Sequence, residues 1–393
     1  MEKIRFTFDP KEAMSEVTKV GILGNFLFYE SNMTGNTCET GMMDNEKFFT
    51  PYEYHKGLEP IGMRYYEDMK FDENSGLWFI EYDLPAGLYQ YRFAVNASLE
   101  DRPTKFPTRK ISAYCGDGII HGLSADTIYF TDSKRPPLIP SFSGQQSDSI
   151  LAVGDRRDFT WLPGLPKENC GKVTYISYDD IDGKPQSLGV YLPANFSRKK
   201  TYPVIYVSHG GGGNEGDWYH QGGIHNIMDN LIYEGKTAEA ILVTMNNSVY
   251  NWDFKKIAKN LYEHIIPFVE EVFPVDKEME KNAFCGLSMG SMTTLYMYMH
   301  ANTKFLYFGA FSGGIAGGEH FSLEDPALFT KKLMIGCAEE DIAWNFREIG
   351  VPPTIEALKA KGLPFTPYFT PGSHDWYCWP QMFTEFAKNM LWK

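Results

Sequence analysis

The chain has 393 residues, of which 43% are hydrophobic and 22% are charged, and at this length two globular domains are the natural expectation. Its formal net charge of −13 argues against nucleic acid or an anionic membrane as a partner, because both require basic surfaces. No run approaches the roughly 18 consecutive apolar residues of a membrane-spanning helix, and residues 1–9 lack the apolar region of a signal peptide. We therefore expect either a cytoplasmic protein or a mature protein from which a signal peptide has been removed.

The first third of the chain has the pattern of short β-strands. Apolar and polar residues alternate along Leu88–Val95, and strand-forming residues dominate Val17–Asn25 and Gly76–Leu84. The turn-forming segment Pro85–Gly87 separates the last two strands. Short strands divided by Gly, Pro and Asn predict a small all-β, immunoglobulin-like sandwich over residues 1–132.

Residues 133–168 are rich in Pro, Ser and Gly, and this composition predicts a linker. After the linker the pattern changes to strands that alternate with helices. The predicted elements are a hairpin of Val173–Tyr178 and Gln186–Leu192, buried strands at Val204–Ser208 and Ala240–Thr244, and amphipathic helices at Ile224–Ile232 and Asp253–Phe273. Such alternation predicts a mostly parallel sheet flanked by helices, which makes residues 169–393 an α/β domain.

The most informative motif is the pentapeptide Gly-Leu-Ser-Met-Gly at Gly286–Gly290. It follows the apolar run Asn282–Cys285 and precedes the helix-like run Ser291–His300. Strand, Gly-x-Ser-x-Gly and helix in this order are typical of the nucleophile elbow of α/β-hydrolases. The two glycines permit a sharp turn that leaves Ser288 standing clear as a candidate nucleophile.

A serine hydroxyl is barely nucleophilic at neutral pH and needs a base, for which His374 is the candidate. It lies in a loop after the strand-like run Phe365–Phe369, whereas other histidines of this region lie in helical runs or in the glycine-rich loop. The base needs an acid that holds its tautomer. Glu339, Glu340 and Asp341 follow the predicted strand 332–337, and all three compete for this role on sequence alone. Asp375 is adjacent to His374, but a neighbouring side chain more often points away than reaches the imidazole.

The tetrahedral intermediate of acyl transfer carries an oxyanion, which is stabilised by backbone amides. The amide of Met289 follows the nucleophile and is one candidate. The other belongs to the glycine-rich loop His209–Gly213, where we select Gly211 ahead of Gly212. A phosphate-binding loop would need a Gly-Lys-Ser/Thr sequence, which this segment lacks.

The six cysteines are scattered along the chain and form no Cys-x-x-Cys pair. Neither a zinc site nor a dense disulfide framework is indicated, and Cys285 and Cys337 lie in apolar runs where buried free thiols are expected. We expect no metal and no cofactor.

Four blocks of the second domain carry a family resemblance. They are Tyr-Pro-Val-Ile-Tyr-Val-Ser-His-Gly-Gly-Gly-Gly-Asn-Glu-Gly-Asp-Trp, Ile-Met-Asp-Asn-Leu-Ile-Tyr-Glu-Gly-Lys, Gly-Leu-Ser-Met-Gly and Gly-Ser-His-Asp-Trp. In this order they resemble the esterase D superfamily, and within it the feruloyl esterases of carbohydrate esterase family 1, over about residues 165–393. The resemblance implies an α/β-hydrolase fold with Ser288 as nucleophile, His374 as base and Asp341 as acid. It also implies an oxyanion hole formed by the amides of Gly211 and Met289.

The N-terminal region carries a second resemblance. Val-x-x-x-Gly-Asn-Phe, Gly-Leu-Trp and Pro-Ala-Gly-Leu-Tyr-Gln-Tyr-Arg-Phe resemble a family-48 carbohydrate-binding module over roughly residues 1–130. Such modules hold glucans with exposed tryptophans, but Trp78 is the only tryptophan of this region and its context suits a core position. A role of this region as a structural lid or docking module is therefore an alternative to carbohydrate binding.

The resemblances imply a serine esterase that acts on hydroxycinnamoyl or acetyl esters of arabinoxylan. Such a substrate lies outside the cell, so we expect secretion or a periplasmic location, with the cytoplasm as the alternative. The candidate contacts to a ferulate or sugar ring are Trp218, Trp252, Trp344 and Trp376. An acetyl-xylan esterase, a siderophore esterase of the enterobactin type and a carbohydrate-binding or scaffold protein with an inactive esterase fold remain alternatives. The oligomeric state stays open.

Overall fold

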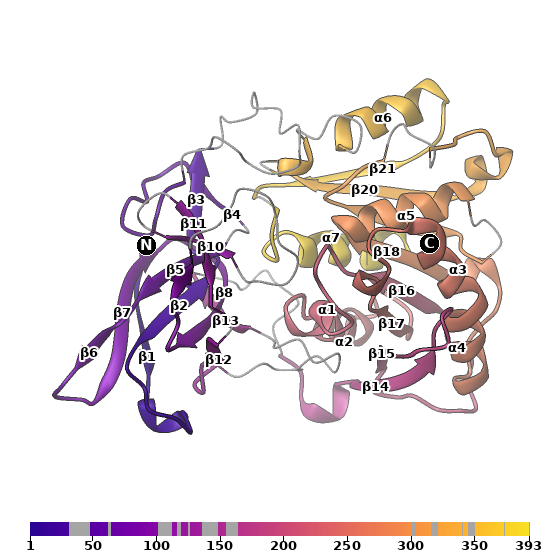
Figure 1. Cartoon of the computed structure of the whole chain (residues 1–393). Coiled ribbons are helices and arrows are strands. Elements are labelled where there is room, and N and C mark those ends of the chain that lie inside the picture. Colours follow the sequence, from indigo (N-terminus) through magenta and orange to yellow (C-terminus); the bar gives the residue numbers. More distant parts are fainter. Residues whose placement is uncertain are drawn as a thin grey trace. The chain divides into compact units, whose positions relative to one another are not determined.

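The computed structural model describes residues 1–30, 48–61, 64–100, 112–115, 119–124, 126–135, 148–154, 164–300, 304–315, 321–339, 341–344, 350–372 and 374–392. These residues form two compact units (Figure 1). The N-terminal unit comprises the described residues of 1–135 and 148–154, and the C-terminal unit those of 164–392. No helix in the described part of the chain is long and apolar enough to cross a membrane.

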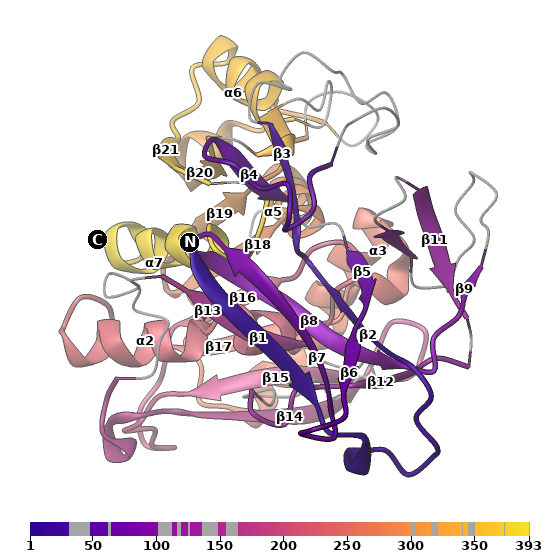
Figure 2. The same cartoon turned by 90° about the vertical axis from the view of Figure 1, so that its left-hand side faces the viewer.

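The N-terminal unit is built from β-sheets, whose strands are coloured from indigo to purple in Figure 2. A three-stranded sheet has the order β1-β7-β6, and a larger sheet has the order β12-β8-β2-β5-β10-β11-β9, with β13 also paired to β8. A two-stranded ribbon pairs β3 with β4. The bounds are β1 Glu2–Phe8, β2 Val20–Gly24, β3 Leu27–Glu30, β4 Leu58–Ile61, β5 Tyr65–Asp68, β6 Lys70–Asp72, β7 Leu77–Leu84, β8 Gly87–Val95, β9 Leu99–Glu100, β10 Ser112–Cys115, β11 Ile119–Leu123, β12 Ile128–Phe130 and β13 Ser149–Val153.

Alternation along the strands creates the core of this unit, because every second side chain points to the same face. In β1, Ile4, Phe6 and Phe8 are buried and join one hydrophobic cluster with residues of β7 and β8. Trp78 is partly buried and packs against this cluster, in keeping with the core position suggested by its sequence context.

The C-terminal unit contains an eight-stranded sheet of order β14-β15-β17-β16-β18-β19-β20-β21. β14 and β15 form an antiparallel hairpin, β15 pairs antiparallel with β17, and all remaining pairs are parallel. The bounds are β14 Lys172–Asp179, β15 Pro185–Leu192, β16 Val204–Ser208, β17 Ile241–Met245, β18 Asn282–Leu287, β19 Tyr307–Phe311, β20 Lys332–Ala338 and β21 Thr366–Thr370. The predicted α/β fold is confirmed, including the hairpin and the buried parallel strands.

Helices connect the parallel strands. The α-helices are α1 Asp217–His220, α2 Ile224–Tyr233, α3 Phe254–Asn260, α4 Ile266–Val272, α5 Met289–His300, α6 Val351–Ala360 and α7 Trp379–Glu385. The short 3₁₀ turns are Pro10–Glu12, Lys167–Asn169, Ser248–Tyr250, Met279–Lys281, Pro326–Thr330 and Ile342–Trp344, and π-turns occupy Leu261–Ile265 and Phe386–Met390.

The helix predicted over Asp253–Phe273 is present as α3, a π-turn and α4 in direct succession. Asp253 caps its start by accepting a hydrogen bond from the amide of Lys256 at 2.9 Å. Pro267 explains the π-turn, because proline has no N–H to donate and its ring collides with the carbonyl four residues earlier.

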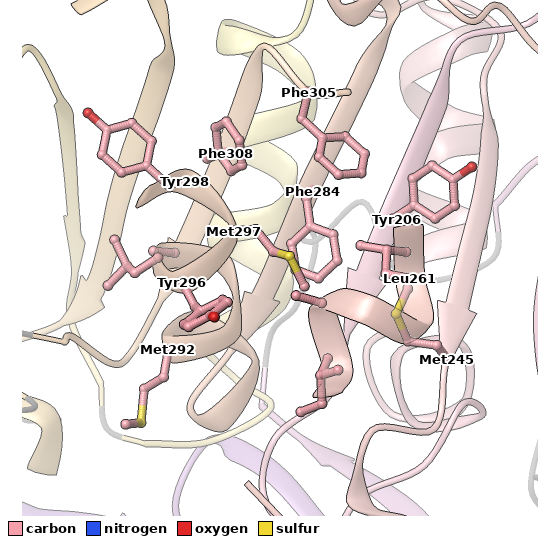
Figure 3. Close-up of a cluster of buried hydrophobic side chains, with 14 of the residues drawn as sticks. Tyr206, Met245, Leu261, Phe284, Met292, Tyr296, Met297, Tyr298, Phe305 and Phe308 are labelled. Carbon is pink, nitrogen blue, oxygen red and sulfur yellow. The ribbon is translucent and has the colours of Figure 1, made fainter. Parts of the chain in front are cut away.

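Different helices pack on the two faces of the sheet. Tyr206 of β16 and Phe284 of β18 belong to the cluster that also holds residues of α3, α4 and α5. Figure 3 shows this cluster, in which Met297 and Phe308 lie near Phe284. On the opposite face, Trp218 of α1 contacts Phe383 of α7, with 5.9 Å between ring centroids. The sheet is thus held between two helical layers, and the carboxyl ends of its parallel strands are left to carry the site.

Candidate functional site

Ser288 lies at the turn between β18 and α5, in the left-handed conformation with φ of 53°. This value is uncommon for a residue with a side chain, and it is what a nucleophile elbow requires. Gly286 and Gly290 flank this turn, and neither position has room for a side chain. A Cβ atom on Gly286 would lie 2.7 Å from the Ser208 carbonyl oxygen, and one on Gly290 would lie 2.5 Å from the same oxygen. The elbow therefore packs directly on the backbone that leads into the glycine-rich loop.

We expect Gly290→Ala to destabilise the fold by about 2 kcal/mol and to lower turnover, because the added methyl group displaces the carbonyls of Ser208 and His209. Gly183→Ala is the matched control, since Gly183 has open space around it and only its φ of 68° opposes a side chain. It should cost about 1 kcal/mol without loss of turnover. Urea unfolding and hydrolysis of 4-nitrophenyl acetate measure both effects. Equal turnover by the two variants would contradict this account of the elbow.

His374 and Asp341 reach Ser288 from the ends of neighbouring strands. β20 and β21 are parallel and pair Ala338 with Thr370 at their last residues, so the loops that follow begin side by side. The Nδ1 atom of His374 lies 2.8 Å from Oδ1 of Asp341, and its Nε2 atom lies 3.1 Å from Oγ of Ser288. The structure therefore brings together the three residues predicted as nucleophile, base and acid.

The hydrogen bonds define the tautomer of His374. With the Nδ1 proton donated to Asp341, Nε2 is the acceptor that faces the Ser288 hydroxyl. Burial by itself would lower the pKa of His374, but the charges of Asp341 and Asp375 and the hydrogen bond that His374 donates to Asp341 outweigh it and raise the pKa above 6.5. The site therefore favours the imidazolium that forms when His374 takes the serine proton.

Asp341 is fixed by its own surroundings. It is fully buried, and its Oδ1 atom also accepts a hydrogen bond from the amide of Ala343 at 2.8 Å. Of the competing acids, Glu339 is exposed, and Glu340 lies outside the described residues. Asp375 uses its Oδ1 atom to accept hydrogen bonds from the amides of Tyr377 and Cys378, so it organises the start of α7.

The glycine-rich loop is held to the neighbouring loop after β17. The Nδ1 atom of His209 lies 2.6 Å from the Gly210 carbonyl oxygen, and its Nε2 atom accepts a hydrogen bond from the amide of Asn247 at 2.9 Å. Asn247 also donates through its side chain to Ser208 Oγ, and Ser248 donates through Oγ to the Gly213 carbonyl, both at 2.9 Å. We call these four contacts the loop clamp.

The loop clamp leaves the predicted oxyanion amides available. Among the described residues, neither the amide of Gly211 nor that of Met289 donates to a protein acceptor. Met289 is the first residue of α5, where a helix presents unpaired N–H groups and a partial positive charge. The amides of Gly211 and Met289 therefore remain our prediction for the oxyanion hole.

His209 is expected to make the fold sensitive to acid. It is fully buried, and this burial lowers its pKa from 6.5 to about 4. The unfolded chain therefore binds a proton more readily, so His209 contributes its full stability above pH 6.5 and loses it as the pH falls towards 4. The loss amounts to roughly 3 kcal/mol.

Urea unfolding between pH 7.5 and pH 4.5 measures this effect. The slope of unfolding free energy against pH should be shallower in His209→Gln than in the natural protein. His300→Gln, at an exposed position, should keep the natural slope. Equal slopes for all three proteins would refute the assignment to His209.

The four candidate tryptophans have different surroundings. Trp218 is 1% exposed and donates its indole N–H to the Ser208 carbonyl at 2.9 Å, so it packs beneath the site and the prediction that it contacts substrate is corrected. Trp344 donates to the Ala338 carbonyl and packs against Phe369. Trp376 is partly exposed and packs edge-on against Trp218. Trp252 is the most exposed of the four, at 48%.

Sequence reasoning missed the loop clamp residues Asn247 and Ser248. The available signal was their position directly after β17, because side chains at the carboxyl ends of parallel strands gather at one edge of the sheet. In addition, the described residues contain no group of three or more His, Cys, Asp or Glu side chains suited to a metal ion.

Residues 182–345 match the family model described as "Putative esterase". The matched residues lie within the C-terminal unit, which is the α/β domain. With a serine, a histidine and an aspartate in hydrogen-bonding order, this domain is a serine esterase of the carboxylic ester hydrolase class.

Curated relatives include enzymes of xylan breakdown. The chain is 29% identical over 260 residues to the endo-1,4-beta-xylanase/feruloyl esterase of Xylanibacter ruminicola, an alignment that covers 63% of this chain and 34% of that protein. It is 30% identical over 159 residues to endo-1,4-beta-xylanase Y of Acetivibrio thermocellus, covering 38% of this chain and 15% of that protein. The chain thus spans only a minor part of the curated relatives it matches.

Solved structures show the same fold. A CE1 ferulic acid esterase from Anaeromyces mucronatus, in complex with ferulic acid, superposes with a TM-score of 0.51 at 23% identity, covering 61% of this chain and 97% of that chain. The enterobactin esterase of Shigella flexneri superposes with a TM-score of 0.53 at 12% identity, covering 98% of this chain and 92% of that chain. The second likeness, unlike the first, covers nearly the whole of this chain.

Proposed function

We propose that this esterase hydrolyses feruloyl and related hydroxycinnamoyl esters on plant cell-wall arabinoxylan, as a member of carbohydrate esterase family 1. The ester hydrolysis rests on one observation, the hydrogen-bonded chain from Ser288 through His374 to Asp341. The feruloyl specificity is supported by the relationship to the xylanase/feruloyl esterase of Xylanibacter ruminicola. A substrate of this kind places the enzyme outside the cytoplasm.

The first half of the reaction acylates the enzyme. Ser288 Oγ attacks the ester carbonyl carbon while its proton moves to His374 Nε2, and Asp341 stabilises the imidazolium that results. The carbonyl oxygen becomes an oxyanion, which accepts hydrogen bonds from the amides of Gly211 and Met289. His374 then gives this proton to the ester oxygen of the sugar as the carbon–oxygen bond breaks, so the sugar leaves as an alcohol and the feruloyl group stays on Ser288.

The second half releases the acid. A water molecule gives one proton to His374 Nε2 and attacks the acyl-enzyme carbonyl, forming a second oxyanion in the same hole. Collapse of this intermediate returns the proton to Ser288 Oγ and liberates ferulate. No step requires a group outside the protein, the ester and water.

A siderophore esterase is the second candidate function, because the fold match to the enterobactin esterase covers both units of the chain. An acetyl-xylan esterase would use the same triad on a smaller acyl group. The three candidates differ in the acyl group accepted, so kinetics with different esters separate them.

The deciding experiment compares kcat/KM for methyl ferulate, 4-nitrophenyl acetate, acetylated xylan and a serine ester of 2,3-dihydroxybenzoic acid. We expect methyl ferulate to be hydrolysed with the highest kcat/KM among the unactivated esters. Hydrolysis of acetyl or dihydroxybenzoyl esters without release of ferulate would overturn the proposal.

For the N-terminal unit we propose a family-48 carbohydrate-binding-like fold. Trp78 packs partly in the core, and its ring centroid lies 5.4 Å from that of Phe71, which is exposed. If the unit binds polysaccharide through this pair, Phe71→Ala in the full chain should weaken retention on insoluble arabinoxylan. Unchanged retention would favour a structural or docking role.

A further inference from the structure

Trp252 has an unusual backbone for a bulky residue. It lies between η3 (Ser248–Tyr250) and α3, with φ of 65°, and Asn251 before it has φ of 46°. Left-handed φ values are uncommon outside glycine, and for a bulky side chain they signal strain that the surrounding structure must hold in place. The residue nonetheless remains 48% exposed, so this backbone conformation does not bury it.

The surrounding loop fixes this backbone. Tyr250 donates its hydroxyl to the buried carboxylate of Asp180 at 3.0 Å, and the amide of Phe254 donates to the Trp252 carbonyl at 3.0 Å. On the other side, the loop clamp binds Asn247 and Ser248 to the glycine-rich loop. Trp252 is therefore an exposed aromatic side chain on a rigid support, which costs little conformational entropy when a ligand binds.

The indole ring of Trp252 lies against the glycine-rich loop, at Gly211. A Cβ atom built on Gly211 would be 3.0 Å from Cζ2 of Trp252, so the ring packs closely over this glycine. Gly211 supplies one of the two candidate oxyanion amides. The exposed ring therefore lies close to the place where the ester carbonyl binds.

The strand order defines which side of the ester Trp252 faces. Along the sheet, β17 and β16 lie on one side of β18, and β20 and β21 lie on the other. Trp252 and Gly211 follow β17 and β16, Ser288 follows β18, and His374 follows β21. His374 must protonate the leaving alcohol, so the alcohol lies towards His374 and the acyl chain extends away from it.

We propose that Trp252 is a specificity-determining residue that stacks on the aromatic ring of the acyl group. This inference rests on the proposed function, because a hydroxycinnamoyl group has such a ring and an acetyl group has none. An offset-stacked or edge-on ring pair contributes up to about tenfold to binding, in addition to the apolar area that it buries.

The test compares two esters with their rings on opposite sides of the carbonyl. Methyl ferulate has an aromatic acyl group and a small alcohol, whereas 4-nitrophenyl acetate has a small acyl group and an aromatic alcohol. We expect Trp252→Ala to raise KM for methyl ferulate about tenfold, with a smaller change in kcat, and to alter kinetics on 4-nitrophenyl acetate less than twofold. Trp252→Phe should restore most of the affinity. Val249→Ala, at an exposed position in the same loop, should match the natural enzyme on both esters.

Each other outcome overturns the inference. Equal losses on both esters would mean that Trp252 only supports the oxyanion loop. A loss confined to 4-nitrophenyl acetate would place the alcohol on Trp252, and unchanged kinetics would show no contact. A natural enzyme that cleaves 4-nitrophenyl acetate but not methyl ferulate would overturn the proposed function together with the inference, and this result is visible before any variant is measured.

Discussion

Ser288→Ala is expected to lower kcat for methyl ferulate and 4-nitrophenyl acetate by about 10⁶-fold while the fold remains intact. Alanine lacks the oxygen that forms the acyl-enzyme, and the hydrogen bond to His374 Nε2 at 3.1 Å disappears with it. Residual turnover would come only from the oxyanion amides and from substrate binding. Initial rates at saturating ester, together with circular dichroism of the variant, measure the two parts of this expectation.

Ser291→Ala is the matched control for this experiment. Ser291 lies three residues further along the same turn and helix, is fully buried where Ser288 is partly exposed, and donates through Oγ to the Gly313 carbonyl at 2.7 Å. Its loss should cost about 1 kcal/mol of stability and leave most of the turnover. If Ser288→Ala kept turnover comparable to Ser291→Ala, the nucleophile would be a different residue.

Asp341→Asn is expected to lower kcat/KM by about 10⁴-fold, the loss that follows when the base is no longer held in the correct tautomer. It should also change the pH profile. Because Asp341 raises the pKa of His374, the natural enzyme should lose activity below an apparent pKa that lies above 6.5. Removing the charge lowers that pKa, so the acid limb of the residual activity should move to lower pH.

Asp375→Asn tests whether Asp375, the other carboxylate close to His374, could be the acid in place of Asp341. Asp375 also raises the pKa of His374, but it is the last of the causes, and its Oδ1 atom is bonded to the amides of Tyr377 and Cys378. This variant should lose stability at the start of α7 and shift the acid limb only slightly. Comparable losses of kcat/KM in the two variants would contradict the assignment of Asp341 as the acid.

Much of the fold could be predicted from local patterns. Apolar runs such as Val204–Ser208 are buried on both faces of a parallel sheet, and the helix over Asp253–Phe273 has one apolar stripe, so both elements are determined by residues close in sequence. The π-turn at Leu261–Ile265 was not foreseen, although Pro267 is its visible cause. Neither pattern identifies which strands become neighbours.

The site was predictable only in part. The elbow glycines and the loop position of His374 have local signatures, but the choice of Asp341 over Glu339 depended on the family resemblance, and the 2.8 Å contact with His374 supports it. The loop clamp joins residues 38 positions apart, and the burial of Trp218 depends on α7, so both arise from tertiary packing. No local pattern encodes such contacts.

The central claim, that Ser288 carries a feruloyl group during turnover, is tested most directly by mass spectrometry of the enzyme quenched in acid during reaction with 4-nitrophenyl ferulate. The activated leaving group makes acylation fast, so the acyl-enzyme accumulates with a burst of 4-nitrophenol. The account predicts a mass gain of one feruloyl group, located on the peptide that contains Ser288 and absent from Ser288→Ala. Turnover without this adduct, or an adduct on another residue that persists in Ser288→Ala, would contradict it.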